Sequence, residues 1–76
     1  MTATQYRIPA AKKVMMRDFN ARFQKLMEAF WTPDKSDEYW DALTEEAMSL
    51  VESFQSDPKT NELISSMVAA FLNSRE

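Results

Sequence analysis

The sequence predicts an all-α protein, folded as an up-down-up antiparallel three-helix bundle. The chain has no glycine, the residue on which tight hairpin turns between strands depend most. Its apolar residues instead recur at steps of three and four, which is the spacing of one helix face. Proline-containing breaks at 32–35 and 56–58 divide the chain into three such stretches. Both connections are short, so neighbouring helices should run antiparallel.

The chain length indicates a single domain. A chain of 76 residues buries only roughly 60–65% of its unfolded surface, so its core should be marginal. Small domains compensate with disulfides, metals or oligomerisation, and the absence of cysteine removes the first of these. We therefore assign 9–76 to one domain that self-associates, with a homodimer favoured; the alternative is an unusually good core supplied by the nine aromatic residues and six methionines. Residues 1–8 should form a flexible or extended leader.

The first helix is expected from Pro9 to about Trp31. Proline suits the first helical position, because an N–H there would have no partner within the helix. Nothing interrupts the helical pattern before Pro33. The apolar face should consist of Ile8, Met15, Met16, Phe19, Phe23, Leu26, Met27 and Phe30.

The second helix should begin after Ser36, an N-cap residue, and run to about Gln55. Asp37 and Glu38 follow in its first turn, where the helix dipole favours negative charge. Its apolar face should consist of Trp40, Leu43, Ala47, Leu50 and Phe54, flanked by Tyr39 and Val51.

The third helix is expected from Pro58, capped by Asp57, to about Asn73. We expect it to be shorter than the first two, each of roughly 20 residues. Its apolar residues spread over nearly ~180°, which indicates burial against more than one neighbour. They are Leu63, Ile64, Met67, Val68, Phe71 and Leu72. The opposite face is small and almost uncharged, which suits either solvent or a homodimer contact; it consists of Glu62, Ser65, Ser66, Ala69 and Asn73.

The missing residue types exclude several chemistries. Without cysteine or histidine there are no thiolate metal sites, no cysteine nucleophile and no triad of the usual kind. Without glycine, phosphate-binding loops lack their usual form. Paired acids such as Asp41 and Glu45 are common on helices and have no ligand loop beside them. We therefore expect no enzyme activity, no cofactor, no metal and no small-molecule substrate.

The N-terminal residues and the hydropathy pattern favour a cytoplasmic protein without a membrane segment. Residues 1–5 are polar and unlike a signal peptide. No stretch approaches the ~20 apolar residues of a membrane span.

Charge is divided unevenly along the chain. Residues 1–31 contain six Lys or Arg and two Asp or Glu, a net charge of +4, whereas residues 32–76 contain three and ten, a net charge of −7. The first interpretation is internal complementarity, in which the basic first helix lies beside the acidic second helix and fixes the register of this antiparallel pair. The alternatives are contact with an acidic protein surface or with nucleic acid. The candidate nucleic-acid contacts scatter over the solvent side of the first helix, without an aromatic stacking platform, and are Lys13, Arg17, Arg22 and Lys25.

An acidic strip lies along one side of the second helix and consists of Glu38, Asp41, Glu45 and Glu52. Met48 lies among these carboxylates at helical spacing. The strip is interpreted as a solvated face, as the partner of Lys and Arg on the first helix, or as a docking strip for a basic protein. In the last case Met48 is the apolar anchor.

Four aromatic residues surround the first break, namely Phe30, Trp31, Tyr39 and Trp40. They form either a hydrophobic plug at the closed end of the hairpin or an exposed hot spot for a partner. Trp31 falls at the edge of the apolar arc, so it is the residue most expected to be exposed. Met27 and Met48 also lie at the edges of their apolar stripes, where methionine serves as core filler or as an adaptable contact.

These observations predict a small, acidic, non-enzymatic protein-protein interaction module, such as an adaptor, an inhibitor or a regulatory or assembly subunit. Two alternatives remain open: an accessory protein that binds nucleic acid through its basic first helix, and a structural subunit of a larger particle. The candidate partner-binding residues are Met27, Trp31, Glu38, Tyr39, Trp40, Asp41, Glu45, Met48 and Glu52.

Overall fold

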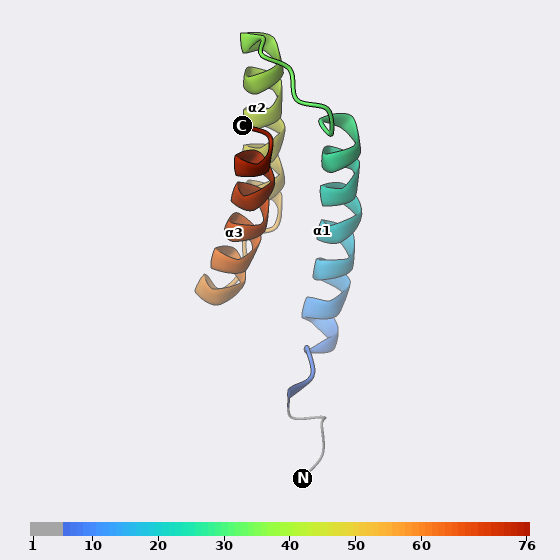
Figure 1. Cartoon of the computed structure of the whole chain (residues 1–76). Helices are drawn as coiled ribbons and strands as arrows, with labels where there is room; N and C mark the ends of the chain where they lie inside the picture. The colour runs from blue at the N-terminus through green and yellow to red at the C-terminus, as the bar shows by residue number, and fades with distance from the viewer. Residues whose placement is uncertain (1–5) are drawn as a thin grey trace.

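The computed structural model describes residues 6–76 and is all-helical in that range. It contains α1 (Ala10–Ala29), α2 (Asp37–Ser53) and α3 (Pro58–Ser74) (Figure 1). No strand occurs among the described residues. In the same part of the chain, no helix combines the length and hydropathy needed to cross a membrane. Of the predicted leader 1–8, residues 1–5 lie outside the described residues, and the other three precede α1 and are exposed.

Local side-chain contacts explain why α2 and α3 begin where they do. The hydroxyl of Ser36 accepts the backbone N–H of Tyr39 at 3.2 Å. The carboxylate of Asp57 accepts the backbone N–H of Thr60 at 3.1 Å, and Pro58 takes the first helical position. Each cap satisfies one of the N–H groups that have no partner within the helix. Both predicted N-caps are therefore confirmed.

The predicted helix lengths need a correction. α1 has 20 residues, but α2 and α3 have 17 each, so the third helix is not the shortest. α2 ends at Ser53 because Phe54 leaves the helical conformation, with φ −120° and ψ 35°. In this conformation the ring of Phe54 lies edge-on to Phe19, with centroids 5.6 Å apart. The helix thus ends two residues before Gln55, the end expected from the break at 56–58.

The core contains three side chains from each helix. Phe19 is fully buried, stacks on Phe23 with centroids 5.5 Å apart, and meets Phe54 edge-on. Phe23 in turn meets Phe71 of α3 edge-on at 6.3 Å. The aromatic rings therefore link all three helices. The buried residues are Phe19, Phe23, Leu26, Leu43, Ala47, Leu50, Ile64, Val68 and Phe71.

Two residues expected on apolar faces are exposed. Ile8 lies outside the helix, since α1 begins at Ala10. Leu63 is 52% exposed, although its neighbour Ile64 is 1% exposed. The reason is that α2 packs against both other helices, whereas α1 and α3 contact each other sparsely. The outer edge of the wide apolar arc of α3 is therefore left uncovered.

Contacts between the helices show which ends lie together. Tyr39, near the start of α2, lies against Phe30 at the end of α1. Lys12, near the start of α1, is bonded to Asp57 at the start of α3. Arg75, just beyond α3, lies over the ring of Trp31, just beyond α1. The same arrangement can be followed in Figure 1.

Candidate interaction surface

A groove runs between α2 and α3 on the side of the molecule that α1 does not cover. It has a volume of about 280 Å³. The groove exists because small side chains, Ala47 on one helix and Ser65 and Ala69 on the other, line it between larger apolar ones. The residues of this α2–α3 groove are Thr44, Ala47, Met48, Val51, Glu52, Ser65, Val68, Ala69 and Leu72.

Met48 is the most accessible large apolar side chain of the α2–α3 groove. It is 58% exposed, so it is not core filler. At 100° per residue, Met48 lies between the groove residues Thr44 and Val51 on one side and the acidic strip on the other. A flexible thioether at such an edge can adapt its shape to a docked apolar side chain.

The acidic strip follows one side of α2 and reaches the groove at Glu52, and none of its carboxylates forms an ion pair within the described residues. Glu38, Asp41, Glu45 and Glu52 are all exposed. Among residues 6–76 the single ion pair joins Lys12 to Asp57, and neither belongs to the strip. Pairing of the strip with Lys and Arg of α1, one of the three interpretations, is therefore not seen within the described residues. The strip instead presents four carboxylates to solvent beside an apolar groove.

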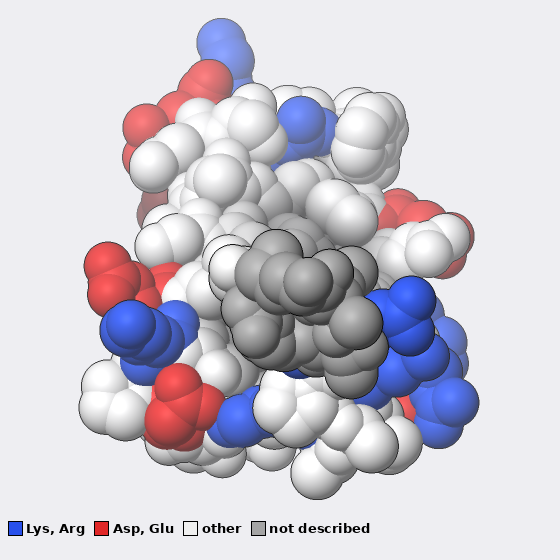
Figure 2. All heavy atoms as spheres, turned by 90° about the horizontal axis from the view of Figure 1, so that it is seen from below, with Lys and Arg blue, Asp and Glu red and all other residues white. Residues whose placement is uncertain are grey.

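The basic side chains of α1 are separate from this surface. Lys13, Arg17, Arg22 and Lys25 are all exposed. Figure 2, which views the molecule from the end where α1 begins, shows Lys and Arg side chains gathered on the α1 side. Arg22 lies over the ring of Phe54, 5.4 Å from its centre. Arg22 and Lys25 also line a second hollow, of about 430 Å³, that includes Leu50 and Glu46 of α2.

The four aromatic residues at the first break separate into two groups. Phe30, Tyr39 and Trp40 are half-buried and meet in successive edge-on contacts, with centroids 5.7 Å and 5.4 Å apart. The Tyr39 hydroxyl donates to the Phe30 carbonyl at 2.7 Å, so its polar group is satisfied internally. These three residues form the plug that closes this end of α1 and α2.

Trp31 lies outside the plug and is 60% exposed. One face of its indole is covered by the Arg75 guanidinium, which lies 4.8 Å from the ring centre and donates to the Trp31 carbonyl. Arg75 also lies 5.0 Å from the centre of Phe71. Arg75 and Trp40 line a hollow of about 530 Å³ at this end. The expected exposure of Trp31 is confirmed, and its role in binding stays a prediction.

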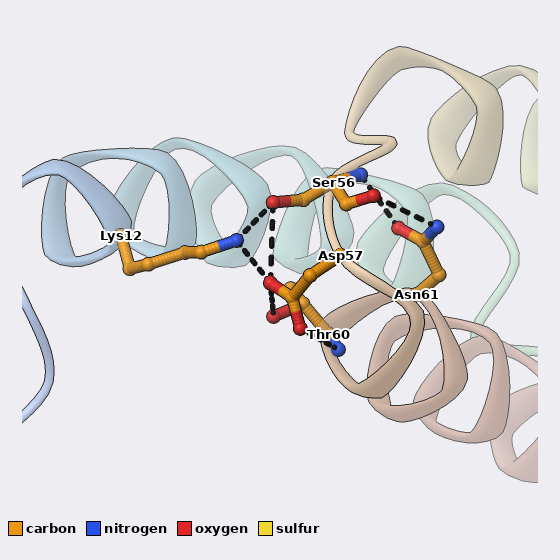
Figure 3. A network of polar contacts seen from close by, with 5 residues as sticks. All are labelled: Lys12, Ser56, Asp57, Thr60 and Asn61. Atoms are coloured by element: carbon orange, nitrogen blue, oxygen red, sulfur yellow. Dashed lines mark hydrogen bonds and ion pairs between the residues drawn. The ribbon is translucent and has the colours of Figure 1, made fainter.

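A polar network joins the start of α1 to the start of α3 (Figure 3). The ammonium of Lys12 donates to the hydroxyl of Ser56 and to the carboxylate of Asp57. The backbone N–H of Ser56 donates to the Asn61 side-chain oxygen at 2.6 Å. The Asn61 amide returns a bond to the Ser56 carbonyl at 3.2 Å.

The Asp57 carboxylate is the centre of this cap network. Its pKa is held well below the usual range, chiefly by the bond from Lys12 and then by the Thr60 hydroxyl and backbone N–H. The network fixes two segments that are 45 residues apart in the sequence. It is a structural link between helices, because each of its polar groups is bonded within the chain.

The structure brings only some of the predicted partner-binding residues together. Met48 and Glu52 line the α2–α3 groove, and the other strip acids follow the same side of α2. Met27 is half-buried and packs against the core on α1, away from the groove. Trp31, Tyr39 and Trp40 lie at the end where α1 meets α2. The predicted partner-binding residues thus lie in two separate places, along α2 beside the α2–α3 groove and at the end where α1 meets α2.

Sequence reasoning missed the α3 half of the groove as part of a binding site. Its residues are Ser65, Val68, Ala69 and Leu72. The signal was present in part, since Ser65 and Ala69 belong to the small-residue face described above. The sequence does not show that this small-residue face of α3 lies next to Met48 of α2.

The described residues contain no group of three or more His, Cys, Asp or Glu placed to hold a metal ion. Comparison of the chain with protein-family models, with curated proteins and with solved structures gave no match.

Proposed function

We propose that this chain is a non-enzymatic protein-protein interaction module, built as an up-down-up three-helix bundle. The α2–α3 groove is its binding site, and its partner is a basic, amphipathic helical segment of a protein. The observation that carries the proposal is the exposure of Met48, at 58%, on the edge of an apolar groove whose lining includes Glu52, one of the four carboxylates along that side of α2.

The apolar floor of the groove favours a helical partner. Val51, Val68 and Leu72 line the groove, and Ala47, Ser65 and Ala69 leave room between them. An amphipathic helix presents apolar side chains at steps of three and four and can place them into such a groove. The polar side chains of the groove are Thr44, Glu52 and Ser65, and the rest of its lining is apolar.

The acidic strip specifies the charge of the partner. α2 contains six acidic residues and no Lys or Arg, so its exposed side repels acidic segments. Lys and Arg beside the apolar face of a partner helix would pair with the strip. Such pairs at the rim raise the association rate and exclude wrong partners, while the apolar contact supplies most of the affinity.

Site-specific photo-cross-linking tests the proposal in the cells that express the chain. A benzoylphenylalanine replaces Met48 in one variant and Ser49 in its matched control. Ser49 is exposed on the same helix but does not line the groove. We expect cross-links from position 48, but not 49, to peptides with net positive charge and apolar residues at helical spacing. Equal cross-linking from both positions, or cross-links to acidic segments or nucleic acid, would contradict the proposal.

A further inference from the structure

The end of the molecule where α1 begins combines positive charge with exposed apolar side chains. Residues 6–17 contain four Lys or Arg and no Asp or Glu, whereas residues 18–29 contain two of each and are neutral. The net positive charge of α1 therefore lies entirely in residues 10–17. Figure 2, which views the molecule from this end, shows Lys and Arg side chains gathered on the α1 side.

Large apolar side chains at the same end are exposed. Tyr6 is 73% exposed, Ile8 is 47% exposed and Val14 is 50% exposed. These are three of the six exposed large apolar side chains of the described residues, and they lie within nine positions of the chain. Single exposed apolar side chains are normal, but several gathered in one short segment indicate a contact surface.

On α1 itself, cationic and apolar side chains share one face. Ala10, Lys13, Val14 and Arg17 follow each other at steps of one to four and lie opposite the buried side of the helix. All four are exposed. Val14 thus has a cation beside it in the chain and another one turn further along the helix.

The cations of this end have no carboxylate partner inside the molecule, apart from Lys12. Lys12 forms an ion pair with Asp57, so these two charges neutralise each other. Arg7, Lys13 and Arg17 are exposed and form no ion pair within the described residues. Three positive charges are therefore available for an external partner.

The acids nearest this end do not cancel that charge. Asp18 is the first acid along α1 and lies beyond the four-residue face, farther from the end. Glu52, the last acid of α2, lines the α2–α3 groove on the side that α1 does not cover. On α3, Glu62 is offset by Lys59. The start of α1 is thus a positively charged surface with apolar side chains among its cations.

We infer that this surface binds a lipid bilayer that contains anionic phospholipids. Lys and Arg close to an anionic bilayer are attracted by the negative surface potential, and apolar side chains beside them enter the boundary between headgroups and acyl chains. The ring and hydroxyl of a tyrosine suit that boundary, where one side is apolar and the other wet. The residues of this α1-start surface are Tyr6, Arg7, Ile8, Ala10, Lys13, Val14 and Arg17.

The apolar side chains favour a bilayer over a nucleic acid as the source of negative charge. Phosphates of a nucleic acid would engage the three cations but leave Ile8 and Val14 in water. A bilayer engages the cations and also removes these two side chains from water. The α2–α3 groove contributes no residue to this surface, so the inference does not depend on the proposed function.

Co-sedimentation of the purified chain with lipid vesicles tests the inference. One set of vesicles contains equal parts of phosphatidylglycerol and phosphatidylcholine, and the other contains phosphatidylcholine alone. We expect binding to the anionic vesicles, weakened by added salt, and much weaker binding to the neutral ones. Each cation near the surface should contribute about fivefold to the binding constant.

Charge variants show which part of α1 is responsible. Lys13→Gln combined with Arg17→Gln should lower the binding constant for the anionic vesicles by about 30-fold. Arg22→Gln combined with Lys25→Gln is the matched control, because it removes the same charge from the later part of the same helix. Binding of the control should equal that of the native chain. Far-UV circular dichroism verifies that both variants fold.

Variants of Val14 test the apolar contribution. Val14→Asn should weaken binding to the anionic vesicles by about fourfold, because half of the valine side chain remains to be removed from water. Leu63→Asn is the matched control, since Leu63 is 52% exposed but lies on α3. Val14→Leu adds one methylene and should strengthen binding by up to about fourfold. A gain of this kind cannot arise from loss of the fold.

Three results would overturn the inference. The first is that the native chain binds neither kind of vesicle, or both equally. The second is that the two double variants lose binding to the same extent. The third is that neither Val14 variant changes the binding constant. A DNA duplex that binds through Lys13 and Arg17, in the absence of vesicle binding, would assign the surface to nucleic acid instead.

Discussion

Adjacent residues of α3 provide the sharpest test of the fold. Ile64 and Leu63 have similar volume and both belong to the predicted apolar face, yet Ile64 is 1% exposed and Leu63 is 52% exposed. Truncation of each to alanine should therefore have very different effects. The difference arises from the sparse contact between α1 and α3, which leaves Leu63 uncovered.

The expected magnitudes follow from burial. Ile64→Ala removes a fully buried side chain and leaves a cavity, which costs about 3 kcal/mol within a typical range of 2–5. Leu63→Ala removes a side chain that is only about half buried, so the loss in the free energy of unfolding is below about 1 kcal/mol. Alanine also has a slightly higher helix propensity, which reduces that cost further. A domain of this length has a total free energy of unfolding of roughly 4–11 kcal/mol, so the first loss is a large fraction of it.

Urea unfolding followed by far-UV circular dichroism measures both changes. We expect the urea midpoint of Ile64→Ala to fall strongly at an unchanged m-value, and its melting temperature to fall by roughly 12–24 °C. Leu63→Ala should shift the melting temperature by less than about 8 °C. Each variant is measured at two protein concentrations, since association with a second copy would add to the apparent stability.

Two results would refute this reasoning. Equal losses for Ile64→Ala and Leu63→Ala would mean that α1 covers both residues, as the sequence alone indicates. Small losses for both would mean that α3 is not held in the core through Ile64. Either outcome would contradict the described packing of α3.

Three further predictions concern polar contacts and are measured by the same unfolding assay. The pKa of Asp57 is lowered in the folded chain. Its carboxylate therefore stabilises the folded chain fully at any pH above the ordinary Asp pKa of about 4. This contribution is lost as the pH falls below that value. Between pH 5 and pH 2, Asp57→Asn should therefore lose less stability than the native chain; an equal loss would exclude a role of this carboxylate. Tyr39→Phe should cost about 1 kcal/mol, because the Phe30 carbonyl loses its side-chain donor, and an unchanged urea midpoint would contradict that bond. Arg75→Ala should cost about 0.5–1 kcal/mol and shift the Trp31 emission maximum in a Trp40→Phe background, whereas an unchanged spectrum would show that the guanidinium does not cover the indole.

Features set by neighbouring residues were predictable from the sequence. Ser36 and Asp57 cap the helices that follow them, because an N-cap acts within three residues along the chain. All nine buried residues lie on the predicted apolar faces, since helical periodicity specifies which side of a helix turns inward. The all-α character of the described part follows from these local rules.

Features set by distant residues were not predictable. Periodicity shows that Leu63 shares a face with Ile64, but not that α1 stays too far away to cover it. The edge-on contact of Phe54 with Phe19 joins residues 35 positions apart in the sequence, and helical periodicity does not show which faces meet. The partner of Lys12 was missed for the same reason, because charge patterning indicates attraction between segments but not individual pairs.

The candidate site was predictable only on its α2 side. The acidic strip and Met48 follow from the spacing of residues on one helix. The groove itself needs two helices in a defined register, which places Ser65 and Ala69 of α3 opposite Met48 and Val51. A single sequence offers no signal for that register.

The positions of the two tryptophans have a practical consequence for spectroscopy. Trp31 follows α1, Trp40 lies near the start of α2, and Arg75 lies beside both at one end of the molecule. Indole emission is thus a local probe of that end, and the opposite end, which contains Lys12 and Asp57, has no tryptophan and does not contribute to this signal. Fraying that begins at the silent end would lower the ellipticity before the emission changes. Coincident curves from the two probes would therefore demonstrate that the whole chain unfolds as one cooperative unit.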